Sequence, residues 1–164
     1  MNANLQIFGF ERDFADTLRC IPMSVRMKLD ECGIKLTLRQ WSRFNYEDRY
    51  ELCYLSTASE VDRQRYRQFL KDLIRARANE EPVFLDRPQS VEWQDEQSVP
   101  LCLQEQIIAK ELSPLPTQKW ASLTPLQRFA LVKLCRSGHE NHNLPAALNE
   151  FNLGSGPIDL IVEI

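Results

Sequence analysis

The sequence lacks the residues and motifs on which most catalytic centres depend. It contains only two histidines, His139 and His142, and both lie in one short polar segment. A serine hydrolase needs a histidine base, and no G-x-S-x-G motif accompanies these two residues. The glycine-rich phosphate motifs G-x-x-x-x-G-K-[ST] and G-x-G-x-x-G are also missing. We therefore expect a protein that is not an enzyme and that binds no nucleotide cofactor.

The cysteines are few and scattered, and none forms a C-x-x-C pair. Their number is odd, which argues against a disulfide framework, and their separation is too large for iron–sulfur ligation. We expect reduced and mostly buried thiols. One alternative stays open, because Cys135, His139 and His142 together offer thiolate and imidazole donors for a metal such as zinc. Their spacing matches no established metal site.

No apolar run approaches the ~18 residues that a membrane-spanning helix requires. Residues 1–10 also lack the cationic segment and apolar stretch of an export signal. The net charge of -3 argues against general binding to nucleic acid or acidic membranes, which requires a positive surface. We expect a globular, cytoplasmic protein.

The most informative feature present is an internal similarity between residues 21–55 and 99–134. Pro22 matches Pro100, and further along Trp41 matches Trp120 and Arg49 matches Arg128. Each copy predicts a helix after the proline, a short helix that carries the tryptophan, and a longer third helix. Capping pairs precede the longer helices, Asn45 with Asp48 and Thr124 with Gln127.

The matched aromatic and basic residues suggest structural roles. We expect both tryptophans to be core anchors. We expect the two arginines to cap the carbonyl groups of a neighbouring helix or to pair with a carboxylate, since a guanidinium makes directed bonds. The first helix of the second copy is expected to end near Ser113 and Pro114.

Residues 61–78 predict an amphipathic helix with apolar side chains on one stripe. The opposite face carries Arg63, Arg67, Lys71 and Arg75 at four-residue spacing. Such a face is either solvated or docks an acidic partner. Paired helices with a basic stripe also leave open a nucleic-acid binder of the helix-turn-helix type.

The fold class predicted is all-α. We expect one compact helical domain over 1–164, with two repeated helical-hairpin units at about 18–78 and 99–151. A proline-containing connector spans about 79–98, a last short helix spans about 144–151, and an apolar tail spans 152–164. Asn143 is expected to cap the last helix. We expect partner binding through the basic face, the polar loop before this helix, or the tail: Arg63, Arg67, Lys71, Arg75, His139, Glu140, Asn141, Asn143, Leu160, Val162 and Ile164.

Two segments carry a resemblance to a known family. They are 18–36, LRCIPMSVRMKLDECGIKL, and 120–151, which includes LTPLQRFALVKL and the tripeptide HEN. Both closely resemble the nitrate-reductase-associated protein family of nitrate-assimilating photosynthetic bacteria. The resemblance spans about 8–151 and leaves out the tail from Pro157.

The resemblance implies an accessory protein or small subunit that binds the ferredoxin-dependent assimilatory nitrate reductase. The catalytic subunit of that enzyme is implied to hold the molybdopterin dinucleotide and the iron–sulfur cluster, so this chain is expected to carry no cofactor or metal. Contact with ferredoxin is expected to be indirect only. Whether the chain is a permanent subunit or a maturation chaperone stays open.

Overall fold

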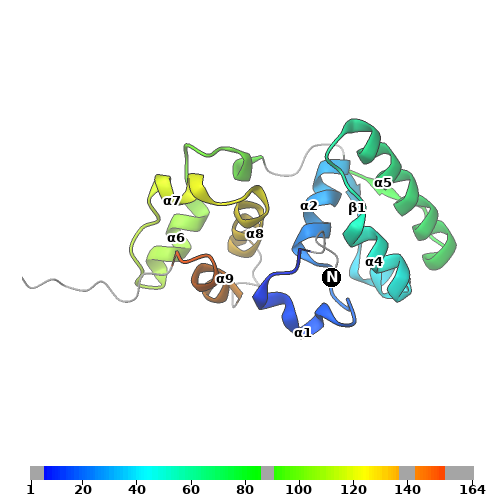
Figure 1. Ribbon diagram of the computed structural model, residues 1–164, viewed down its shortest axis with the longest axis horizontal. Coiled ribbons are helices and arrows are strands. Elements are labelled where there is room, and N and C mark those ends of the chain that lie inside the picture. Colours follow the sequence, from blue (N-terminus) through cyan, green and yellow to red (C-terminus); the bar gives the residue numbers. More distant parts are fainter. Residues whose placement is uncertain (1–5, 86–90, 137–142, 154–164) are drawn as a thin grey trace, which may run out of the picture. The chain divides into compact units, whose positions relative to one another are not determined.

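A computed structural model of the chain describes residues 6–85, 91–136 and 143–153 (Figure 1). The described part is mostly helical, which confirms the all-α prediction, and its strands form one small antiparallel pair. The chain divides into two compact units, Met1–Gln89 and Ser90–Ile164. The single domain over 1–164 and the duplication of a whole unit stay predictions.

The first unit holds helices that pack around α2. Antiparallel pairing joins Ile34 to Phe84 and Lys35 to Val83, so residues 79–85 return to the end of α2. The predicted helix at 61–78 is present as α5, which continues into a π-helical turn. The elements in order are η1 (Gly9–Glu11), α1 (Arg12–Ala15), α2 (Met23–Cys32), β1 (Ile34–Lys35), α3 (Leu38–Arg43), α4 (Tyr46–Tyr54), α5 (Glu60–Leu73), η2 (Ile74–Ala78) and β2 (Val83–Phe84).

Side-chain caps explain where the first unit's helices begin. Asn45 accepts from the Asp48 amide, and Asp48 accepts in return from the Asn45 amide, which confirms the predicted capping box of α4. An equivalent box of Thr37 and Gln40 begins α3. Gly33 ends α2 with φ of +65°, a left-handed conformation that a glycine adopts without steric cost.

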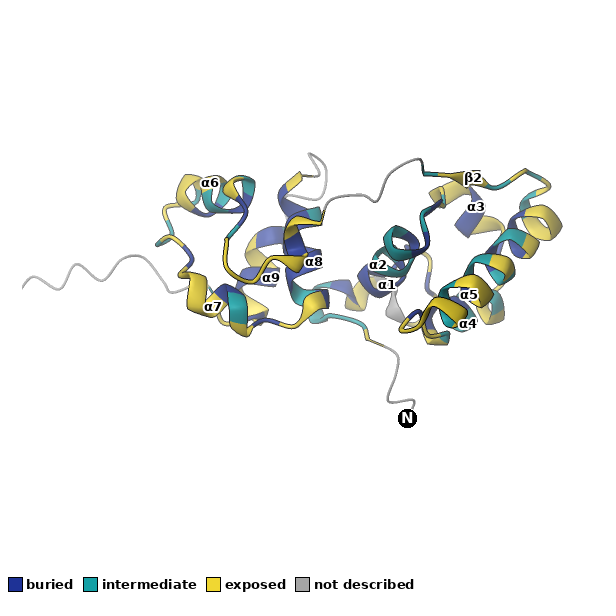
Figure 2. Ribbon diagram, turned by 90° about the horizontal axis from the view of Figure 1, so that it is seen from above, coloured by how far each residue is buried: buried dark blue, intermediate teal, exposed yellow. Residues whose placement is uncertain are grey.

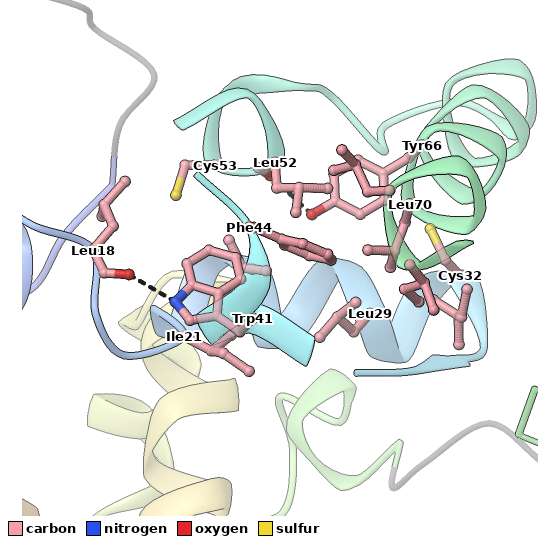
Figure 3. Close-up of a cluster of buried hydrophobic side chains, with 14 residues drawn as sticks. Leu18, Ile21, Leu29, Cys32, Trp41, Phe44, Leu52, Cys53, Tyr66 and Leu70 are labelled. Atoms are coloured by element: carbon pink, nitrogen blue, oxygen red, sulfur yellow. Dashed lines mark hydrogen bonds between the residues drawn. The ribbon is translucent and has the colours of Figure 1, made fainter. Parts of the chain in front are cut away.

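The core of the first unit lies between α2, α3, α4 and α5 (Figure 3). Trp41 is fully buried there, and Phe44 packs edge-on to it with ring centroids 6.2 Å apart. Tyr66 from α5 is also fully buried and donates its hydroxyl to the Leu52 carbonyl at 2.8 Å. The stripe predicted for α5 is confirmed, since Leu70, Leu73 and Ile74 are buried beside Tyr66 and Phe69 is partly buried.

The second unit centres on α8, which contacts η3, α6 and α9. Its buried side includes Phe129, Leu131 and Leu134. The amides and side chains of Thr124 and Gln127 exchange two hydrogen bonds, so the capping pair predicted for α8 is confirmed. The elements in order are η3 (Glu92–Gln94), α6 (Leu101–Ala109), α7 (Thr117–Ser122), α8 (Pro125–Arg136) and α9 (Leu144–Glu150).

One expectation for the second unit is wrong. Helix α6 ends at Ala109, before Ser113 and Pro114, because Glu111 adopts φ of +59° and the chain turns there. The segment 79–98, predicted as a connector, contains β2 of the first unit and η3 of the second. Trp93 of η3 is buried edge-on against Phe129 with ring centroids 5.9 Å apart.

Exposed and buried residues alternate around the helices, as Figure 2 shows along α4 and α5. Exposed large apolar side chains occur in both units and include Tyr46, Tyr54, Leu101 and Ile108. Within the described ranges, no helix combines the length and apolar character that crossing a membrane requires.

Candidate functional site

A tryptophan and an arginine hold the segment that precedes α2. Trp41 donates its indole N–H to the Leu18 carbonyl at 2.7 Å (Figure 3). Arg49 donates to the carbonyls of Thr17 and Leu18, both at 3.3 Å, and to those of Trp41 and Ser42 in α3. Leu18 itself has φ of +50°, which is unfavourable for an L-residue with a side chain. These bonds fix its carbonyl in place.

The same two residue types act alike in the second unit. Trp120 is fully buried and donates its indole N–H to the Asp95 carbonyl at 2.7 Å. Arg128 donates to the carbonyls of Trp93 at 2.8 Å and Leu123 at 2.6 Å, and pairs with Glu96 at 3.5 Å. The roles predicted for the tryptophans and arginines are therefore confirmed. These residues hold the fold together and are not offered to a ligand.

The predicted basic face, on α5 and the following turn η2, is engaged in contacts within the first unit. Arg63 pairs with Glu60 at 2.9 Å, and Arg67 donates to the Cys32 carbonyl at the end of α2. Lys71 lies over the Phe84 ring at 5.0 Å from its centroid, and Arg75 pairs with Glu81 at 3.2 Å. Each of the four cations in this face therefore has a contact within the first unit. Its role in partner binding stays a prediction.

The other predicted partner-binding residues fall mostly outside the described part of the chain, namely His139, Glu140, Asn141, Leu160, Val162 and Ile164. Asn143 is described and occupies the position before α9, but its side chain makes no capping hydrogen bond there. The expectation that Asn143 caps this helix is therefore wrong. Its backbone is already helical at φ of -84°, which does not present the side chain as a cap.

The metal hypothesis rests on residues of which only Cys135 is described, since His139 and His142 lie outside the described ranges. The Cys135 thiol donates to the Val132 carbonyl at 3.1 Å. Burial raises its pKa well above the ordinary value, so it is a neutral thiol at physiological pH. Within the described residues, no group of three or more His, Cys, Asp and Glu is placed to hold a metal ion. The described cysteines are free thiols.

A row of tyrosines on α4 was not singled out from the sequence. Tyr46, Tyr50 and Tyr54 recur every four residues and stack, with ring centroids 6.4 and 6.5 Å apart. Tyr46 is 50% exposed and Tyr54 is 46% exposed, whereas Tyr50 packs partly against the core. The four-residue spacing in YEDRYELCY was visible in the sequence. We call these three residues the tyrosine row.

A polar pocket of about 340 Å³ opens between α2 and the end of α4. Lys28 donates to the carbonyls of Cys53 and Leu55, and burial lowers the pKa of its ammonium group. Glu31 accepts from the Thr57 hydroxyl at 2.8 Å. Both charged groups are therefore engaged in hydrogen bonds within the first unit. The lining residues are Gln6, Ser24, Lys28, Glu31, Tyr54, Ser56, Thr57 and Ala58.

No curated protein and no solved structure shows a significant match to this chain. A family model does match, and it is described as the conserved nitrate reductase-associated protein. The match covers residues 7–151, which include the described helices of both units. The resemblance of segments 18–36 and 120–151 is thereby confirmed. With most of its length covered by the family model, this chain belongs to the conserved nitrate reductase-associated protein family.

Proposed function

We propose that this chain is a non-catalytic accessory protein that binds the catalytic subunit of the assimilatory nitrate reductase. Family membership over residues 7–151 is the observation that carries the proposal. The molybdopterin dinucleotide and the iron–sulfur cluster belong to the catalytic subunit, and electrons from ferredoxin reach that subunit directly. The accessory protein acts in the cytoplasm and supports assembly, stability or activity of the enzyme.

The structure supports this role through what its polar groups already do. Arg49, Arg128, Lys28 and Arg67 donate to backbone carbonyls and so hold helices and loops of their own unit. The buried thiols of Cys32 and Cys53 have raised pKa values, to about 11 and about 12, because burial disfavours the thiolate. Neutral thiols of this kind are poor nucleophiles. Among the described residues, the exposed helix faces are the surfaces that remain for binding another protein.

Binding gives a physical route to an effect on the enzyme. A protein that binds only the folded, cofactor-loaded reductase stabilises that state by mass action. At a free concentration one hundred times Kd, the stabilisation is about 2.7 kcal/mol. Such a gain raises the amount of active enzyme without any chemistry by the accessory protein.

Co-expression tests the proposal directly. The catalytic subunit would be expressed with and without this chain, and the molybdenum and iron content, the activity and the co-purifying protein would be measured. We expect the chain to co-purify and to raise the yield of active reductase. A catalytic subunit that never co-purifies with the chain and is equally active without it overturns the proposal. The affinity of the chain would also be measured separately for cofactor-free and for cofactor-loaded reductase. A maturation chaperone binds the cofactor-free enzyme more tightly, whereas a permanent subunit binds the loaded enzyme at least as tightly.

The metal alternative has its own test. Elemental analysis of the purified chain would show stoichiometric zinc or iron if Cys135, His139 and His142 bind a metal. The same preparation, passed over immobilised DNA at low salt, tests the nucleic-acid alternative. Metal-free protein that is not retained excludes both.

A further inference from the structure

We infer that the tyrosine row and the two glutamates beside it, Glu47 and Glu51, form a docking face for an arginine-bearing segment of the partner protein. The segment is taken to belong to the nitrate reductase catalytic subunit, so this inference rests on the proposed function. It adds the place of contact and the chemistry that recognises it. The face lies entirely on α4 and needs no residue of the second unit.

The tyrosine row leaves apolar ring surface exposed on α4. Tyr46 and Tyr54 present about half of their surface to solvent, in a stacked row rather than singly. Only Tyr50 is drawn partly into the core. Aromatic side chains lose little conformational entropy on binding and are enriched at protein–protein contacts. A stacked row is already ordered before a partner arrives, so less entropy is lost on binding.

The charged residues of α4 fall into two groups, those with partners inside the unit and those without one among the described residues. Asp48 pairs with Arg77 at 2.9 Å, and Arg49 donates to carbonyls of α3 and of residues 17 and 18. Both charges are therefore used inside the unit. Glu47 and Glu51 make no ion pair or side-chain hydrogen bond with any residue in the described ranges. Glu47 and Glu51 are one helical turn apart, and each lies three residues before a tyrosine of the row, Tyr50 and Tyr54, so these side chains are neighbours on the surface of α4.

The residue types select the partner's chemistry. A guanidinium stacks flat on an aromatic ring and at the same time forms directed bonds to a carboxylate. Alternating tyrosine and glutamate along a helix supplies both surfaces within reach of one arginine. An acidic peptide or a nucleic acid would bring like charges against Glu47 and Glu51. A second copy of this face would do the same, which disfavours self-association through α4.

Affinity measurements with purified, cofactor-loaded reductase test the docking face. One variant reverses the charges, Glu47→Arg with Glu51→Arg, and another removes the exposed rings, Tyr46→Ser with Tyr54→Ser. Tyr50 is left unchanged because it contributes to the core. Matched controls are Glu105→Arg, an exposed acid on α6, and Val61→Ser with Leu101→Ser, two exposed apolar residues elsewhere. Circular dichroism confirms that each variant is folded.

We expect each α4 variant to weaken binding at least tenfold and each control to change it less than threefold. A photo-crosslinker placed by Tyr46→benzoylphenylalanine should label an arginine-containing peptide of the reductase, identified by mass spectrometry. If the wild-type chain binds but the α4 variants bind equally well, the docking face is wrong and the proposed function stands. If the wild-type chain binds neither the cofactor-loaded nor the cofactor-free reductase, both are wrong. Dimers of the chain alone that dissociate in the α4 variants would also overturn the inference.

Discussion

The indole N–H of Trp41 and the carbonyl oxygen of Leu18 are joined by a hydrogen bond of 2.7 Å between fully buried residues. Leu18 has a left-handed backbone at φ of +50°, so the bond holds a conformation that the chain does not favour by itself. Arg49 donates to the same oxygen at a longer distance of 3.3 Å. The tryptophan is therefore the stronger of the two restraints.

We predict that Trp41→Phe lowers the free energy of unfolding of the first unit by about 2 kcal/mol, through a lost buried hydrogen bond and lost packing. Urea unfolding followed by far-UV circular dichroism measures the change. Trp93→Phe is the control, because the Trp93 indole N–H donates to no residue in the described ranges. A loss below about 0.5 kcal/mol for Trp41→Phe would show that Arg49 alone suffices.

Arg128 and Arg49 occupy matched positions but differ in burial, since the Arg128 side chain is 4% exposed. Arg128→Lys removes the fork that reaches the carbonyls of Trp93 and Leu123, and leaves at least one of them unsatisfied. We expect Arg128→Lys to lower the free energy of unfolding by about 2 to 3 kcal/mol. For Arg49→Lys we expect about 1 kcal/mol, because the hydrogen bonds of Arg49 are nearer to solvent. Thermal unfolding of both variants checks the order. Equal losses would contradict the role assigned to burial.

Glu111 ends α6 in a left-handed conformation, with φ of +59°. Glu111→Gly removes the steric cost of this conformation, and we expect it to stabilise the second unit by about 1 kcal/mol. Glu105→Gly, at an exposed position inside α6, should destabilise by about the same amount. Melting temperatures of the two variants should therefore move in opposite directions. A fall in both would mean that Glu111 contributes a contact that outweighs its strain.

The buried thiols predict how stability changes at alkaline pH. Burial raises the pKa of Cys53 from 9.0 to about 12, so the folded chain keeps a proton that the unfolded chain has lost above pH 9. The contribution of Cys53 is complete below pH 9 and is lost as pH rises toward 12, with a slope of at most about 1.4 kcal/mol per pH unit. Lys28, with a lowered pKa, acts in the opposite direction over its own range.

Cys53→Ala isolates the thiol. The difference in unfolding free energy between wild type and this variant should shrink between pH 8.5 and pH 10.5 in urea titrations at fixed ionic strength. Cys32→Ala removes a second thiol whose pKa burial raises to about 11, and it should show a change in the same direction. A difference that stays constant across this range would contradict the raised pKa.

The helices could be predicted because their signals are local. Side-chain caps such as Asn45 with Asp48 depend on residues three apart, and the apolar stripe of α5 repeats within one turn. Residues 83–84 and 92–94 were missed because their structure depends on distant partners. Phe84 pairs with Ile34, and Trp93 is buried by Phe129, and neither contact has a periodic signature in the sequence.

The candidate site was harder to predict for a related reason. Charge patterning located the basic residues of α5 but gave no information on their partners, such as the Cys32 carbonyl for Arg67. The row of Tyr46, Tyr50 and Tyr54 had a clear spacing, yet the same spacing is typical of a buried stripe. Only the exposure of two of these rings distinguishes a surface from a core.

The indole bonds to Leu18 and Asp95 also determine where the polypeptide can be shortened. A fragment that starts at the first residue of α2 loses the acceptor for Trp41 and also Glu11, whose carboxylate accepts from the Met23 amide at 2.7 Å. A fragment that starts at α6 loses the Asp95 carbonyl that accepts from Trp120 and the Trp93 carbonyl that accepts from Arg128. We therefore expect fragments that begin ahead of Phe8 or ahead of Glu92, which keep these acceptors, to be more stable than fragments cut at the helix starts.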